Sequence, residues 1–241
     1  MNFDQFLAPV DATRVRRVLE KFALRGLDKL ALTGGLALQA NWIARGLDTN
    51  VRPLSDLDIV VESFSSIPDA LATEFLVRHI HPHAPAGKLL MQVVDPSEAV
   101  RVDVFRPCGA TMARSQSVRF GTAPIQVVSL EDLAARAASL LMGIEQSATV
   151  ARKHAQAFDS MLPFIDPDRA EIAWQDQRKP RDPSAFKEAS ARIRSLLESR
   201  SNLLIEVEYS RDVDAVCPWC EEIGLLRLSS AAKIMSILGY C

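Results

Sequence analysis

The chain has 241 residues, of which 48% are hydrophobic and 24% charged, and its formal net charge is −2. This composition is typical of a globular protein with a substantial buried core. The small net charge excludes a bulk field that would recruit nucleic acid or an anionic membrane. The N-terminus lacks the pattern of a secretory signal, and no run is long enough for a membrane span. We therefore expect a cytoplasmic protein without membrane contact, whose four cysteines are free or metal-bound rather than paired.

Hydrophobic periodicity and turn residues predict the order of helices and strands. Helices are expected at 11–26, 35–47, 71–79, 129–143, 147–165 and 182–200, and strands at 29–32, 57–64, 88–94, 99–106 and 125–129. These elements predict an α+β fold, a mixed sheet of about four or five strands with flanking helices, followed by an α-helical part. We expect an α/β core over 1–145, a helical part over 146–200 and an acidic, cysteine-containing tail over 201–241.

Two acidic residues stand at the start of a strongly apolar run, in the sequence LSDLDIVVES at 54–63. Side chains alternate between the faces of a strand, so Asp56 and Asp58 share one face while Leu57 and Ile59 lie on the other. Neighbouring carboxylates repel unless a cation bridges them. Mg²⁺ is the natural bridge, because it is held by one or two carboxylates together with substrate phosphates.

A third acidic residue fits the same geometry. In the sequence AVRVDVF the valines face one way, and Arg101, Asp103 and Phe105 face the other. An acid inside an apolar strand is costly without a partner. If this strand lies beside residues 57–62, Asp103 completes a cluster of three carboxylates. Such a cluster can hold two metal ions, the arrangement that clamps the attacking and leaving oxygens in phosphoryl transfer.

A glycine turn, LTGGLAL, stands between a predicted strand and a predicted helix. Gly34 and Gly35 allow a phosphate to approach the backbone. The helix N-terminus that follows offers free N–H groups and a favourable dipole. An ordinary strand-to-helix turn has the same sequence pattern. The glycine turn therefore indicates a phosphate site only in combination with the acidic residues.

Taken together, TGG after a strand, SDLDIVV and RVDVF resemble the nucleotidyltransferase superfamily with the polymerase β-like fold, over roughly residues 25–165. The spacing is similar to that of the AbiEii-type branch, which includes toxins of bacterial toxin–antitoxin pairs. Arg52 before the acidic pair and the sequence SLEDLAAR after the third acid match that branch. Lys153 and Asp159 match a helical Lys and Asp, but His154 departs from the acid usual in that branch.

The resemblance implies a role for each matching residue. Asp56, Asp58 and Asp103 would bind Mg²⁺, with two ions in the full site, and Asp103 would help to deprotonate an acceptor hydroxyl. The nucleoside triphosphate would be bound by Thr33, Gly34, Gly35, Arg52 and Ser55, and Lys153 would act with the catalytic acids.

The reaction implied by the resemblance is transfer of a nucleoside monophosphate to an acceptor, with release of pyrophosphate. A tRNA end, a protein hydroxyl and a small molecule such as an aminoglycoside all remain open as acceptors. An antitoxin protein is an expected partner if the chain is a toxin. The alternative is a catalytically inactive protein that uses the same fold as a binding scaffold.

The C-terminal cysteines are a separate feature. Cys217 and Cys220 form a C-x-x-C motif, and Cys241 is the last residue. They can be free thiols, three ligands of a structural Zn²⁺ site, or a redox pair. A small zinc-stabilised nucleic-acid module is a third hypothesis, which rests on this motif and on the basic stretch at 178–200.

Overall fold

The computed structural model describes residues 2–51, 53–54, 56–120, 123–143 and 148–200 of the chain. Within these ranges the chain divides into two compact units. The first comprises residues 2–107 and 115–127, and the second comprises Cys108–Arg114 and residues 128–200.

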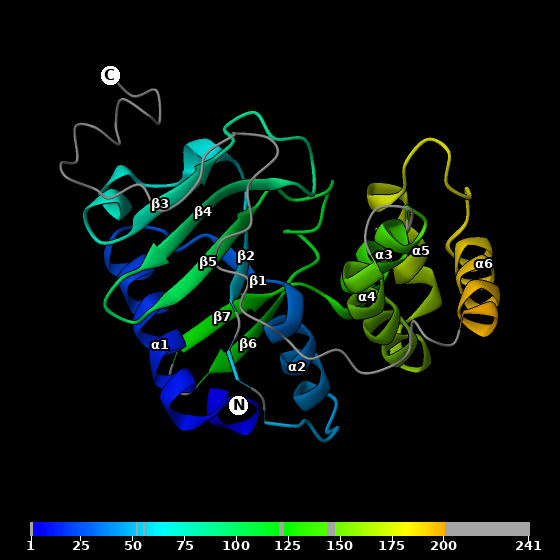
Figure 1. Cartoon of the computed structure of the whole chain (residues 1–241), viewed down its shortest axis with the longest axis horizontal. Helices are drawn as coiled ribbons and strands as arrows, with labels where there is room; N and C mark the ends of the chain where they lie inside the picture. The colour runs from blue at the N-terminus through cyan, green and yellow to red at the C-terminus, as the bar shows by residue number, and fades with distance from the viewer. Residues whose placement is uncertain (1, 52, 55, 121–122, 144–147, 201–241) are drawn as a thin grey trace. The chain divides into compact units, whose positions relative to one another are not determined.

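The first unit is built on one mixed sheet. Its strands are β1 Leu30–Leu32, β2 Leu57–Val61, β3 Leu76–Ile80, β4 Leu89–Asp95, β5 Val100–Phe105, β6 Gln116–Phe120 and β7 Ala123–Val127. Among the described residues, these seven strands lie in the order β3-β4-β5-β2-β1-β7-β6 (Figure 1). The β2–β5 and β1–β7 pairs are parallel and the other neighbours are antiparallel. The predicted α+β fold with a mixed sheet is confirmed, but the sheet has more strands than the four or five expected.

Two edge strands account for the difference. The helix predicted at 71–79 is wrong, because a 3₁₀-helix at Asp69–Thr73 is followed by β3, which pairs with β4. Tertiary pairing here overrides a short helical pattern. Strand β6, at the opposite edge, is mostly polar and exposes Ser117 and Arg119, so it gives little hydrophobic signal.

In the described residues of this unit the α-helices are α1 Pro9–Leu24 and α2 Gly34–Ala44. The helix α1 is amphipathic and buries a stripe that ends at Phe22, whose ring stacks on Phe75 with centroids 5.0 Å apart. The helix α2 starts directly after β1 and packs on β2 and β7. Its first residue therefore lies where the carboxylate-bearing strand begins.

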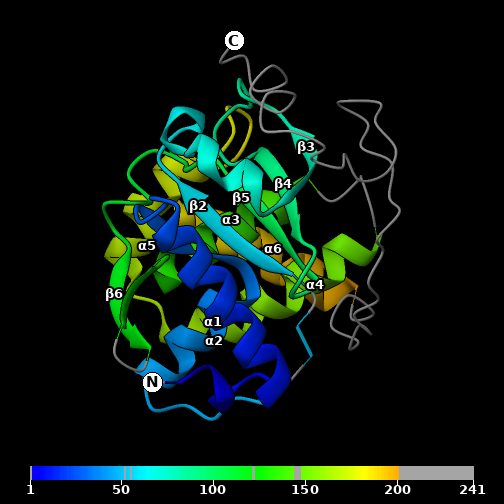
Figure 2. The same ribbon diagram turned by 90° about the vertical axis from the view of Figure 1, so that its left-hand side faces the viewer.

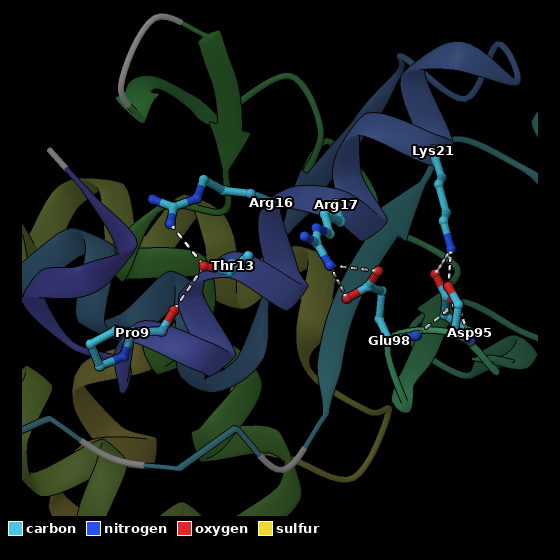
Figure 3. Close-up of polar contacts among 8 residues, drawn as sticks. Pro9, Thr13, Arg16, Arg17, Lys21, Asp95 and Glu98 are labelled. Carbon is cyan, nitrogen blue, oxygen red and sulfur yellow. Dashed lines mark hydrogen bonds and ion pairs between the residues drawn. The ribbon is translucent and has the colours of Figure 1, made fainter.

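Polar contacts join α1 to the turn between β4 and β5 (Figure 3). The fully buried carboxylate of Asp95 accepts a 2.6 Å bond from Lys21 Nζ. It also accepts bonds from the backbone N–H groups of Ser97 and Glu98 and from the Ser97 hydroxyl. Every oxygen of this buried charge thus has a donor, which fixes the hairpin that carries Asp103.

We expect Asp95→Ala to lower the free energy of unfolding by about 2–4 kcal/mol, because it leaves the turn N–H groups without their acceptor and Lys21 without its ion pair. The matched control is Arg17→Ala. Arg17 is 60% exposed and lies 3.4 Å from Glu98, so its loss should cost less than about 0.5 kcal/mol. Urea unfolding followed by circular dichroism measures both values, and equal losses would contradict the account.

The second unit is helical. Its α-helices are α3 Leu130–Leu141, α4 Ala148–Met161, α5 Pro167–Gln177 and α6 Phe186–Ser199, and α3 packs on the other three (Figure 1). The expected helices at 129–143, 147–165 and 182–200 are therefore present, with shorter bounds. The prediction missed α5, which begins with an Asp166 N-cap and Pro167, a standard helix-start pattern.

The sequence SLEDLAAR forms the start of α3. Ser129 caps the helix by accepting from the backbone N–H of Asp132 at 3.1 Å. The buried Asp132 carboxylate accepts two hydrogen bonds from the Arg114 guanidinium, at 2.9 and 2.7 Å. Hydrogen bonding to Asp132 raises the pKa of Arg114 above its usual value. These polar residues therefore stabilise the interior of the helical unit.

In the part of the chain that the structure describes, none of the helices combines the length and the apolar character that crossing a bilayer requires.

Candidate active site

The three predicted acids come together on two neighbouring central strands of the sheet. Strands β2 and β5 run side by side and parallel (Figure 2), with Asp58 directly opposite Asp103 in the register. Asp56 stands one residue before β2. Ligand oxygens of the three carboxylates all lie within 4.8 Å of one another, and each residue is half-buried. The predicted alternation of β5 is confirmed too, since Val100, Val102 and Val104 are buried.

The glycine turn lies against this cluster. Thr33 donates its backbone N–H to the Asp58 carbonyl at 3.0 Å, because β1 pairs with β2. Gly34, the first residue of α2, has a φ of +59°. A Cβ atom at this position would stand 2.0 Å from Asp58 Oδ2. Only glycine leaves room for the Asp58 carboxylate and tolerates this conformation.

The segment that enters β2 is held from α1. Asp11 accepts the backbone N–H of Leu54 at 3.0 Å and a bond from Arg14 at 3.1 Å. Leu54 is buried and stands two residues before Asp56. Asp11 therefore helps to position the acidic pair, a role that no local sequence pattern indicates.

Two further side chains of the site were not predicted as site residues. The Arg101 guanidinium forms an ion pair with Asp56, and its Nε lies 3.5 Å from Asp103 Oδ1. Gln92 on β4 donates from Nε2 to the same Asp103 oxygen at 2.6 Å. Arg101 could have been found from strand alternation, since it stands two residues before Asp103. Gln92 could not, because it depends on the register of β4 against β5.

The electrostatics of the cluster follow from this arrangement. Burial alone would lower the pKa of Arg101, but the nearby charges of Asp103 and Asp56 outweigh burial, and the pKa is raised. Arg101 therefore stays charged at every physiological pH and offsets one of the three negative charges.

The donor set fits a hard divalent cation. Three carboxylates in mutual reach offer the oxygen ligands that Mg²⁺ prefers, and the absence of a Cβ atom at position 34 lets the Asp58 carboxylate take its place in the cluster. Asp56, Asp58 and Asp103 are the residues that would hold such an ion.

The other predicted site residues are distributed along the chain as follows. Lys153 and His154 are on α4 of the helical unit. Gly35 is the second residue of α2, beside Gly34. Several of the predicted residues lie outside the described part of the chain, namely Arg52, Ser55, Cys217, Cys220 and Cys241.

His154 gives the helical unit a pH dependence. Burial, followed by the charges of Lys153 and Arg136, lowers the pKa of His154 to about 4. Between about pH 6.5 and 4, His154 is therefore protonated in the unfolded chain but not in the folded chain. The free energy of unfolding consequently falls as the pH falls. We expect His154→Gln to recover about 1–2 kcal/mol of unfolding free energy at pH 5 relative to pH 7.

Urea unfolding at the two pH values measures this difference. The matched control is His83→Gln, since His83 is exposed and its loss should leave the pH dependence unchanged. An identical pH dependence in wild type and His154→Gln would refute the assignment.

Comparison with known proteins gives the following. No family model matches the chain, and no curated protein matches it in sequence. The solution structure of the antibiotic-resistance factor ANT(2″)-Ia is similar, with a TM-score of 0.45 and 11% identity over 79% of this chain and 96% of the other. A crystal structure of ANT(2″)-Ia in complex with adenylyl-2″-tobramycin has a TM-score of 0.45 and 11% identity, over 68% of this chain and 94% of the other.

A third structure is an antigenic nucleotidyltransferase-like protein from Paracoccidioides brasiliensis. Its TM-score is 0.46 and its identity 16%, over 79% of this chain and 88% of the other. At these TM-scores and identities the function has to be argued from the residues of the site.

Proposed function

We propose that the chain is a Mg²⁺-dependent nucleotidyltransferase that moves a nucleoside monophosphate from a triphosphate to a hydroxyl of an acceptor. The observation that carries the proposal is the convergence of Asp56, Asp58 and Asp103 against the Gly34 turn. An enzyme that transfers a group from a triphosphate needs carboxylates to bind the metal ion. It also needs free N–H groups, such as those of a glycine turn at a helix N-terminus, to bind the phosphates.

Each residue has a chemical task in this proposal. The N–H groups at the start of α2, from Gly34 and Gly35, cradle the phosphates, with Thr33 beside them. Asp103 accepts the proton of the attacking hydroxyl. Arg52, Ser55 and Lys153 contribute to triphosphate binding or charge neutralisation. Bound Mg²⁺ supplies charge stabilisation for the phosphoryl group in transfer and for the pyrophosphate that leaves.

The finer assignments belong to the same proposal. The sequence motifs favour the AbiEii-type branch and a toxin that an antitoxin partner restrains. The acceptor is an RNA such as a tRNA end, a protein hydroxyl or a small molecule. Aminoglycosides are among the small molecules to test, and ANT(2″)-Ia has been crystallised with adenylyl-2″-tobramycin. Cys217, Cys220 and Cys241 remain a proposed Zn²⁺ site, which metal analysis of the purified protein tests.

The test is a transfer assay. Each of the four α-³²P-labelled ribonucleoside triphosphates is incubated with the protein and Mg²⁺, together with total tRNA, a purified protein mixture or an aminoglycoside. We expect label to reach one acceptor with one nucleotide, with equal release of pyrophosphate, and Asp58→Asn to abolish both. Absence of transfer and of pyrophosphate release in every combination would overturn the proposal.

A catalytically inactive scaffold is the second candidate, and Arg101 is the observation that favours it. Its ion pairs with Asp56 and Asp103 neutralise part of the negative charge of the cluster. The cluster therefore does not need a metal ion for this purpose. A scaffold of this kind binds triphosphates weakly and shows no turnover, whereas an enzyme needs the carboxylates for metal.

A further inference from the structure

Arg101 lies inside the carboxylate cluster. Its guanidinium pairs with Asp56, and its Nε lies 3.5 Å from Asp103 Oδ1. The Arg101 side chain is 26% exposed and both aspartates are 14% exposed. These charges are therefore partly shielded from solvent, and the attraction between them is stronger than at a fully exposed surface.

The direction of the Arg101 side chain is informative. Residues 100, 102 and 104 of β5 fill the core, so Arg101 and Asp103 share the opposite face. Arg101 reaches across to Asp56, which stands one residue before β2. Gln92 donates a hydrogen bond to Asp103 Oδ1, and Arg101 Nε lies 3.5 Å from the same oxygen.

We propose that Arg101 is a built-in counter-cation that competes with divalent metal for Asp56 and Asp103. This inference deepens the proposed function and rests on it. Before substrate arrives, Arg101 holds the mutually repelling carboxylates together. A divalent ion bound by the same oxygens would meet the positive guanidinium at close range, so metal alone binds weakly.

A triphosphate changes this balance, because its anionic oxygens offer the guanidinium a bidentate partner in place of Asp56. The site consequently takes up metal and nucleoside triphosphate together rather than metal first. Arg101 thus makes the site selective for the metal–nucleotide complex. In the absence of nucleotide, it weakens the binding of divalent ions to the protein.

The experiment is a titration with Mn²⁺ alone, with free Mn²⁺ followed by electron paramagnetic resonance and no nucleotide present. We expect Arg101→Gln to bind Mn²⁺ about tenfold more tightly than wild type, or tighter still. Arg101→Lys, which pairs with one carboxylate at a time, should lie between the two. The control is Arg119→Gln, which removes an exposed positive charge on β6 and should leave Mn²⁺ affinity at the wild-type value.

A second readout concerns the metal-free protein. In EDTA, Arg101→Gln should lower the Tm, and adding Asp103→Asn to it should restore part of the loss by removing one repelling charge. Should Arg101→Gln fail to fold, Arg101→Lys carries the Mn²⁺ test alone. Mn²⁺ affinity that is unchanged or weaker in the Arg101 variants, or Mn²⁺ binding in none of the proteins, would overturn the inference.

The two proposals fail differently. If the Arg101 variants bind Mn²⁺ more tightly but no protein transfers a nucleotide, the counter-cation stands and the enzyme does not. If wild type transfers a nucleotide and the Arg101 variants show unchanged Mn²⁺ affinity, the enzyme stands and the counter-cation does not.

Discussion

Gly34→Ala should abolish function while the similar change Gly46→Ala should not. Both glycines have positive φ, +59° and +71°, so both substitutions strain the backbone by about 1–2 kcal/mol. A Cβ atom at position 46 meets nothing within 4 Å, whereas at position 34 it stands 2.0 Å from Asp58 Oδ2. The Asp58 carboxylate must therefore move from the position that it holds in the cluster.

We expect Gly34→Ala to lower the free energy of unfolding by about 2–4 kcal/mol. We also expect it to reduce nucleotide transfer at least about a hundredfold, because a displacement of about 1 Å in a catalytic group has that effect. Gly46→Ala should keep near-wild-type activity. Comparable activity in the two variants would show that the contact between Gly34 and Asp58 has no part in function.

The second large effect is expected for Asp103→Asn. Asparagine has nearly the same shape but cannot accept the proton of an acceptor hydroxyl and is a weaker ligand for a hard cation. Nucleotide transfer should fall by about 10²–10⁴-fold. Stability should stay the same or rise, because the substitution removes one of three carboxylates that repel one another.

Steady-state transfer rates and thermal unfolding together test this prediction. The matched control is Asp48→Asn, which makes the same chemical change at an exposed position and should alter neither quantity. Loss of activity together with a large loss of stability in Asp103→Asn would mean that the acid is structural rather than catalytic.

The three acids and the glycine turn could be predicted because each is visible in a short stretch of sequence. An acid at the start of a strand and one in the middle of another strand are visible in the alternation of apolar and polar residues. Their approach required only that the two strands be neighbours, which the register of Asp58 against Asp103 confirms. The glycine turn was visible for the same reason, since it lies between a strand and a helix.

The remaining features depend on contacts between residues far apart in the chain. Gln92 reaches Asp103 because β4 pairs with β5 in one register, and Asp11 reaches Leu54 because α1 packs beside the segment that enters β2. Strand β3 forms because β4 offers it an edge. Such features follow from packing rather than from propensity, so periodicity in one sequence does not indicate them.

The most direct test of the central claim is calorimetric titration with each of the four ribonucleoside triphosphates, with and without Mg²⁺, beside Asp58→Asn. The three carboxylates and the Gly34 turn predict binding of at least one triphosphate that requires Mg²⁺ and disappears in the variant. Binding that is absent for all four nucleotides, or that is the same in Asp58→Asn, would contradict a metal-dependent nucleotide site and favour the scaffold.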